Sequence, residues 1–151
     1  MTLDELRALC HEAARDLVDR NAGSVPAAVV LPLPASTQVA TLEGFPDDDQ
    51  QRHWVLSKFA ADRMVPSGVP CYGFVAPAEL DAGDDGRVDV VLVAYGARHR
   101  GSWVTAAPLD GAALGPFSEA EQLDPTALPF LQPLQHAADL AQGVDDVLGT
   151  S

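Results

Sequence analysis

Two strand-like segments joined by a short, glycine-flanked link constrain the fold of this chain more than any other feature. Apolar and β-branched residues dominate the segments 87–95 and 102–109, and such runs are typical of β-strands. The link between them reads GARHRG and has a glycine at each end, Gly96 and Gly101. Because glycine adopts the backbone angles that a tight reversal needs, this pattern predicts a β-hairpin.

The expected tip of this hairpin concentrates positive charge in an acidic protein. The 151-residue chain has nine basic and 22 acidic residues and a formal charge of −13. Two guanidinium groups beside an imidazole favour binding of a phosphate, a carboxylate or an acidic partner surface. The alternative is that these side chains only keep an exposed turn solvated. The candidate partner- or anion-binding residues are Arg98, His99, Arg100 and the neighbouring Trp103.

The overall charge and hydropathy exclude two classes of partner. Dense negative charge on nucleic acids and on anionic membranes opposes binding of a protein with a net charge of −13. No run of about 18 apolar residues could span a bilayer. Asp4, Glu5 and Glu12 interrupt any amino-terminal signal pattern. We therefore expect a cytoplasmic protein with no nucleic-acid and no membrane partner. Separately, the amino-acid composition is typical of a protein from a high-GC bacterial genome.

Hydropathy along the rest of the chain alternates between helical and strand-like periodicity. The expected elements, in chain order, are a helix over 3–21, strands over 27–33 and 37–42, a helix over 46–64, strands over 69–75, 87–95 and 102–109, and a helix over 133–148. They predict one α+β domain over 1–151, with a five-stranded, mostly antiparallel sheet and three helices packed on one face as a two-layer structure. In element order this is similar to roadblock and longin-type adaptor modules, although no residue motif accompanies the similarity.

Capping residues and prolines indicate where elements begin and which strands lie at an edge. Thr2 followed by Glu5 predicts a capping box, and Pro46 suits the first turn of the second helix. Pro32 lies in the first pair of strands, and proline cannot donate a ladder hydrogen bond, so we expect this pair at a sheet edge or near a turn. The segment 111–133 is rich in glycine and proline. The sequence leaves open whether this segment forms a lid, an interface or irregular packing.

No motif for catalysis, metal binding or cofactor binding is present. The chain lacks a nucleophile elbow, a phosphate loop and a dinucleotide fingerprint. Its two cysteines and four histidines are not paired at metal-ligand spacing. Cys10 and Cys71 lie in apolar surroundings and are interpreted as buried thiols. We therefore predict no catalytic residue, no metal site and no cofactor.

This pattern favours a non-enzymatic interaction module, of adaptor or chaperone-like type, that binds an unidentified protein partner. A homodimer formed through a helix face or an edge strand is its expected form. Trp54 and Trp103 either pack in the core or leave one indole exposed as an interface anchor. The alternative function is a small-molecule sensor or enzyme with a pocket between the sheet and the second helix. The residues expected to line that pocket are His53, Trp54, Cys71, Tyr72 and Glu79.

Overall fold

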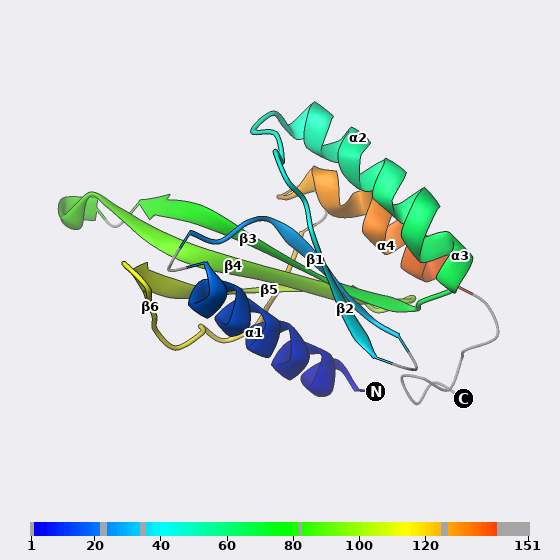
Figure 1. Ribbon diagram of the computed structural model, residues 1–151, viewed down its shortest axis with the longest axis horizontal. Helices are drawn as coiled ribbons and strands as arrows, with labels where there is room; N and C mark the ends of the chain where they lie inside the picture. The colour runs from blue at the N-terminus through cyan, green and yellow to red at the C-terminus, as the bar shows by residue number, and fades with distance from the viewer. Residues whose placement is uncertain (1, 22–23, 34–35, 82, 125–126, 142–151) are drawn as a thin grey trace.

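The protein, seen here as a computed structural model, has one antiparallel sheet with helices on both of its faces (Figure 1). The structure describes residues 2–21, 24–33, 36–81, 83–124 and 127–141. The strands in these ranges are β1 (Ala28–Pro32), β2 (Thr37–Thr41), β3 (Cys71–Asp81), β4 (Arg87–Ala97), β5 (Gly101–Asp110), β6 (Ala113–Leu114) and β7 (Glu121–Gln122). The helical elements are α1 (Leu3–Arg20), α2 (Asp49–Phe59), the π-helical turn η1 (Ala60–Met64), α3 (Val65–Ser67), the 3₁₀ turns η2 (Gly83–Asp85) and η3 (Pro129–Leu131), and α4 (Gln132–Asp139).

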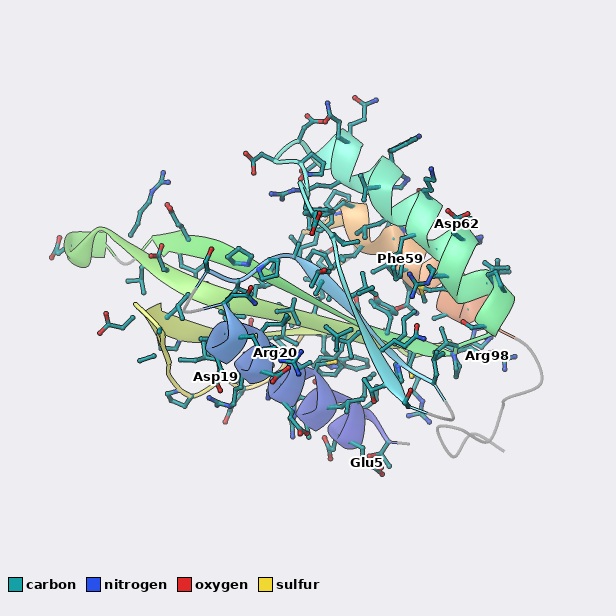
Figure 2. All side chains as sticks on the ribbon, viewed as in Figure 1. Glu5, Asp19, Arg20, Phe59, Asp62 and Arg98 are labelled. Atoms are coloured by element: carbon teal, nitrogen blue, oxygen red, sulfur yellow. The ribbon has the colours of Figure 1, made fainter. Side chains whose placement is uncertain are left out.

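Helix α1 covers one face of the sheet. The backbone N–H of Glu5 donates to Thr2 Oγ1 over 3.1 Å, and the helix ends at Arg20 with Asn21 as its C-cap, which confirms both expected ends. Glu5 and Asp19 point away from the sheet in Figure 2, and the exposed Arg20 pairs with Asp16 over 2.9 Å. The opposite side of α1 packs on β3 and β4 and buries Leu6, Cys10, Ala14, Leu17 and Val18.

Helices α2 and α4 lie side by side over the other face (Figure 1). Phe59 points from α2 toward α4 and the sheet, whereas Asp62 points away from them (Figure 2). The core on this side joins side chains from all three elements, including Leu56, Phe59, Met64, Tyr72, Phe74 and Leu134. Since α1 occupies one face and α2 and α4 occupy the other, the protein has three layers and not the expected two.

The position of β1 explains why the layering differs from the expectation. The sheet order is β2-β1-β3-β4-β5-β6, with β7 also pairing with β5. Val29 of β1 faces the α2 and α4 core, and the next residue, Val30, faces the α1 core. A strand that is buried on both faces has a continuous run of apolar residues, as β1 does. In the sheet, β1 lies between β2 and β3. Only β2 of the predicted pair is therefore at the edge.

The predicted hairpin is confirmed as β4 and β5, and the mixed α+β class is confirmed with it. Tyr95 pairs with Trp103 across the hairpin, and their rings stack with centroids 6.3 Å apart. His99 and Gly101 have positive φ values of 59° and 76°. The interpretation of Gly96 as a second turn residue was wrong. A Cβ there would lie 2.8 Å from the carbonyl oxygen of Gly101, so close packing is what requires glycine.

The second helix begins later and continues less regularly than expected. Asp48 caps it by accepting a 2.9 Å hydrogen bond from the N–H of Gln51, so Pro46 lies outside its first turn. The π-helical turn η1 interrupts it, and Gly68 ends it with a φ of 65°. Irregular turns of this kind are frequent at functional sites.

The glycine- and proline-rich segment contains two short strands that sequence periodicity did not reveal. β6 and β7 both pair with β5, which raises the strand count of the described residues to seven. Phe117 lies between them and packs against the α1 core. The final helix, α4, ends at Asp139, and residues 142–148 of the expected helix fall outside the described residues. Within the described part of the chain, every helix is too short or too polar to cross a bilayer.

Candidate functional site

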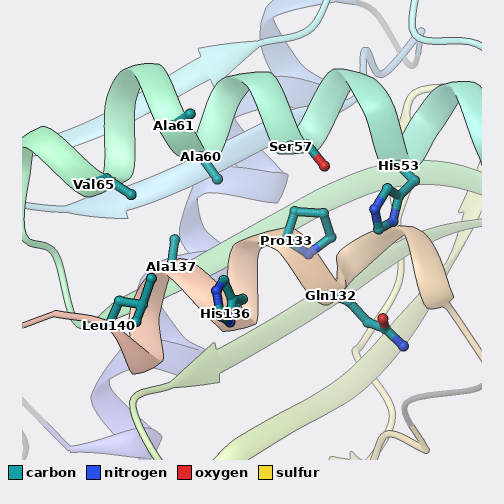
Figure 3. Close-up of a pocket in the computed structure, with 10 residues that line it drawn as sticks. All are labelled: His53, Ser57, Ala60, Ala61, Val65, Gln132, Pro133, His136, Ala137 and Leu140. Atoms are coloured by element: carbon teal, nitrogen blue, oxygen red, sulfur yellow. The ribbon is translucent and has the colours of Figure 1, made fainter.

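A groove of about 420 Å³ runs between α2 and α4, and Figure 3 shows side chains from both helices lining it. Its polar groups include the imidazoles of His53 and His136 and the hydroxyl of Ser57. Small and apolar side chains supply most of the remaining surface. The α2–α4 groove is lined by His53, Ser57, Ala60, Ala61, Val65, Gln132, Pro133, His136, Ala137 and Leu140.

Large apolar side chains are exposed around this groove. Val65 and Leu140 line it and are 55% and 54% exposed. Trp54 is 66% exposed and lies on α2 one turn before Ser57, a lining residue. The Lys58 ammonium lies 5.9 Å from the centre of the Trp54 ring. This face therefore combines a hollow with a projecting indole.

A second hollow of about 420 Å³ lies between the sheet and the start of α2. Three phenylalanine rings border it, and we call it the Phe pocket. The ring centroids of Phe45 and Phe130 each lie 5.7 Å from that of Phe74. The Phe pocket is lined by Pro26, Ala27, Leu42, Glu43, Gly44, Phe45, Asp47, Arg52, Phe74, Ala76, Pro77, Ala78, Leu92, Leu128 and Phe130.

Arg52 joins α2 to two of these rings. Its guanidinium carbon lies 5.5 Å from the centre of the Phe45 ring and 5.3 Å from that of Phe130. Its Nε donates a 2.6 Å hydrogen bond to the carbonyl oxygen of Pro46. Carboxylate oxygens of Asp47 and Asp49 lie 3.7 and 3.9 Å from its terminal nitrogens. The positive charge of Arg52 therefore already has several partners.

The residues predicted to line a single pocket are spread over the molecule. His53 lines the α2–α4 groove, and the neighbouring Trp54 is exposed. Cys71 faces the α1 core and Tyr72 faces the α2 and α4 core. Glu79 accepts a 3.1 Å hydrogen bond from Arg87 and lines neither hollow. The Phe pocket lies between the sheet and the second helix, where the sequence suggested a pocket. None of the five residues expected to line that pocket lines the Phe pocket.

The Arg98-His99-Arg100 tip packs against the end of α4. The N–H of His99 donates to Asp139 Oδ1 over 2.8 Å, and the N–H of Arg98 donates to the carbonyl oxygen of Pro70 over 2.7 Å. Trp103, which the sequence grouped with this tip, packs instead against the α1 core. The structure therefore does not bring the four candidate anion-binding residues together. Three lie at the tip beside α4, and Trp103 packs against the α1 core.

A hydrogen-bond network beneath the tip is centred on Gln135. Its Nε2 donates to the carbonyl oxygen of Ala97 over 2.9 Å and to Asp139 Oδ1 over 3.0 Å. Its Oε1 accepts a 3.0 Å hydrogen bond from the hydroxyl of Tyr72, whose pKa is raised mainly by burial. No sequence signal indicated this network.

The two cysteines are buried, free thiols, as interpreted from the sequence. Burial raises the pKa of Cys10 to about 12, with a further contribution from Cys71. Burial likewise raises the pKa of Cys71 to about 11. Thiols with pKa values this high are poor nucleophiles near neutral pH. Among the described residues, no group of three potential metal ligands is found.

His11 forms a polar contact between α1 and β5. Its Nε2 lies 2.8 Å from Thr105 Oγ1, and its ring stacks on Phe117 with centroids 3.8 Å apart. Burial, followed by the charges of Arg7 and Arg15, lowers the pKa of His11 to about 4. The folded protein therefore holds this imidazole in its neutral form.

This shift predicts a pH-dependent contribution of His11 to stability. The folded-state pKa lies below the ordinary value of 6.5, so protons bind more readily to the unfolded chain. The stabilisation is present above pH 6.5 and is lost as the pH falls toward about 4. We expect the difference in free energy of unfolding between the wild type and His11→Gln to shrink over that range in urea titrations. A constant difference would contradict this, and His99→Asn, at an exposed histidine outside the α2–α4 groove, is the control.

Comparison with known proteins gives this chain no relative. No protein-family model, no curated protein and no solved structure matches it. The similarity in element order to roadblock and longin-type adaptors therefore gains no support.

Proposed function

We propose that this protein is a non-enzymatic interaction module that acts as a homodimer through the face formed by α2 and α4. The observation that carries the proposal is the position of Trp54, a 66% exposed indole on α2 that directly follows His53, a lining residue of the α2–α4 groove. Exposed apolar side chains that gather on one face indicate an interaction site more strongly than a single one does, and Trp54 shares helix α2 with the groove that Val65 and Leu140 line. Tryptophan is also enriched among the residues that dominate binding energy at interfaces.

A second copy of the chain suits this face. A twofold interface brings the same patch of both protomers together, so the patch must be complementary to itself. The α2–α4 face offers a projecting Trp54 and a groove lined by small side chains such as Ala60, Ala61 and Ala137. In a twofold dimer the indole of each protomer would occupy the groove of the other. Val65 and Leu140 would then lose their contact with water.

The open edge of the sheet is a less suitable dimer interface. The exposed strand β2 has the sequence TQVAT, and Val39 is its one large apolar residue. Beside this edge, α1 presents the carboxylates of Glu12, Asp16 and Asp19, which outnumber the one basic residue that lines the same surface, Arg15. Edge-to-edge pairing of two copies would bring these negative charges together, and like charges at close range repel. This comparison favours the helical face over the β2 edge.

The proposal predicts that Trp54→Ser converts a dimer into a monomer. Loss of a central aromatic anchor costs about 2 kcal/mol or more, which raises the dissociation constant at least about 30-fold. Native mass spectrometry and light scattering on a dilution series measure this change. Leu80→Ser is the matched control, because Leu80 is an exposed apolar residue at the far end of β3.

Two outcomes would contradict this assignment. A wild-type protein that stays monomeric at every concentration would exclude the homodimer. A dimer that survives Trp54→Ser but dissociates on Val39→Ser would move the interface to the β2 edge. Equal circular dichroism spectra of the variants would confirm that folding is unchanged.

A further inference from the structure

We infer that the open edge of β2 binds an extended segment of another protein that has basic side chains at every second residue. Such a segment would join the sheet as one more strand, with main-chain hydrogen bonds for affinity and alternate side chains for specificity. This edge is a different surface from the α2–α4 face, so the inference holds whether or not the proposed dimer forms. The same α1 carboxylates that oppose pairing of two copies at this edge favour a basic partner.

The outer side of β2 presents backbone groups for an added strand. The N–H of Leu42 donates to the carbonyl oxygen of Ala27 over 2.7 Å, so every second residue of β2, counted from Leu42, directs its backbone toward β1. The N–H and C=O groups of the alternate residues Thr37, Val39 and Thr41 therefore point away from β1. Within the described part of the chain, no strand pairs with β2 on that side.

The chain covers its other sheet edge but leaves β2 without the usual protection. Along β5, strands β6 and β7 pair with the edge, and between them Ser118 Oγ accepts a 3.1 Å hydrogen bond from the N–H of Ala106. Proteins commonly protect an exposed edge strand with a lysine, a proline or a bulge. The strand β2 has the sequence TQVAT and pairs with β1 at five successive residues, so it has none of these. It is therefore a regular template for one more strand.

A hollow of about 500 Å³ between α1 and β2 suits long side chains of an added strand. The α1–β2 hollow is lined by Leu9, Glu12, Ala13, Arg15, Asp16, Asp19, Thr37 and Val39. A residue that pairs with Val39 would direct its side chain to the same face of the sheet as Val39 does. The hydrocarbon part of a lysine can lie on apolar residues such as Leu9 and Ala13 while its ammonium group reaches a carboxylate.

The carboxylates of the α1–β2 hollow favour a basic side chain over an acidic one. In the described ranges, neither Glu12 nor Asp19 has a cationic side chain within 4 Å of its carboxylate. Asp16 pairs with Arg20, but both side chains are exposed, and such pairs contribute little free energy. An ammonium group that enters the hollow therefore meets carboxylates, whereas an incoming carboxylate meets repulsion.

Two other arginines near β2 differ in their effect on an added strand. Arg15 lines the hollow, but its guanidinium carbon lies 5.3 Å from the centre of the Phe117 ring, which follows β6 at the opposite edge of the sheet. Arg63 lies on the other face of β2, where its Nη2 donates to Gln38 Oε1 over 3.1 Å. A basic side chain on that face would meet the Arg63 charge. The edge therefore favours basic residues at alternate positions, all on the α1 face.

Three labelled peptides with blocked ends test the inference. They are TKTKTKT, TETETET, and TTKKKTT, which has the composition of the first but consecutive lysines. Fluorescence polarisation should detect binding of TKTKTKT, about tenfold weaker binding of TTKKKTT, and no binding of TETETET. Hydrogen exchange locates the site, because bound TKTKTKT should slow exchange of the amides of Thr37, Val39 and Thr41.

Glu12→Lys and Glu119→Lys change the net charge equally, and only Glu12 lines the α1–β2 hollow. Glu119 is exposed between β6 and β7, at the opposite edge. Glu12→Lys should weaken binding of TKTKTKT about tenfold, because repulsion replaces attraction, and Glu119→Lys should leave it nearly unchanged.

Val39→Pro should abolish binding, because proline removes an outward N–H and no hydrogen bond to β1. Thermal unfolding reports whether this variant still folds, and Glu12→Lys tests the site without a change in the strand.

Several results would overturn the inference. They are equal binding of the lysine and glutamate peptides, equal binding of the two lysine peptides, absence of binding by all three, or unchanged exchange of the outward amides. Protection of these amides in the protein alone, increasing with its concentration, would also overturn it by assigning the edge to a second copy. Trp54→Ser should bind TKTKTKT as the wild type does, so failure of the dimer and failure of this site can be told apart.

Discussion

Replacing Gly73 with alanine is expected to lower the free energy of unfolding by about 2 kcal/mol, because the core beneath α1 is overpacked by the added methyl group. A Cβ at this position of β3 would lie 2.3 Å from Cys10 Sγ and 3.2 Å from the Cβ of Val30. Both neighbours are fully buried, so neither can move into solvent. Glycine-to-alanine changes usually stabilise by restricting the unfolded chain, and the steric conflict reverses that sign. Urea denaturation measures the change.

The double variant Gly73→Ala with Cys10→Ala separates this steric conflict from other effects of the substitution. Removing the Cys10 sulfur leaves the nearest α1 atom, the Cβ of residue 10, at 3.5 Å, which is an ordinary contact distance. We therefore expect the double variant to be more stable than the sum of the two single variants predicts, by about 1 kcal/mol. Additive effects would contradict a direct conflict between the two positions. Helix α1 can thus lie this close to the sheet because residue 73 is a glycine and has no side chain.

The elements that the sequence predicted well are those that local chemistry determines. Thr2 and Glu5 mark the start of α1. The hairpin of β4 and β5 follows from two apolar runs and a short link. Each of these signals lies within a few residues of the feature it specifies. Local capping residues, turn residues and hydrophobic periodicity are sufficient to predict features of this kind.

The layering and the hollows could not be predicted, because both depend on contacts between distant segments. The apolar run of β1 fits an edge strand or a strand covered on both faces, and only the pairing with β3 decides between them. Phe45 lies in a loop and Phe130 in the glycine- and proline-rich segment, so no periodic pattern connects them to Phe74. The exposure of Trp54 also depends on where α4 lies. The five residues that the sequence suggested for a pocket between the sheet and the second helix do not line the Phe pocket.

Gln135→Ala is expected to destabilise the protein by about 2 kcal/mol and to release the hairpin tip from α4. The side chain of Gln135 makes hydrogen bonds to Tyr72, Ala97 and Asp139, and Asp139 in turn accepts from the N–H of His99. Without the amide, the Tyr72 hydroxyl keeps only its contact with Ser102, in a fully buried residue. Faster hydrogen exchange at the His99 amide would report release of the tip. Gln51→Ala, at an exposed glutamine on α2 outside the groove, should change neither quantity.

A double substitution tests whether Tyr72 and Gln135 depend on each other for their hydrogen bonds. Removing one partner of a buried hydrogen bond leaves the other unsatisfied, whereas removing both can be nearly neutral. Tyr72→Phe with Gln135→Ala should therefore destabilise less than the two single changes added together. If the effects simply add, the network contributes no coupling between α4 and β3. If they couple, the Arg98-His99-Arg100 tip is held by the same buried amide that joins α4 to the sheet, and its orientation is set from within the core.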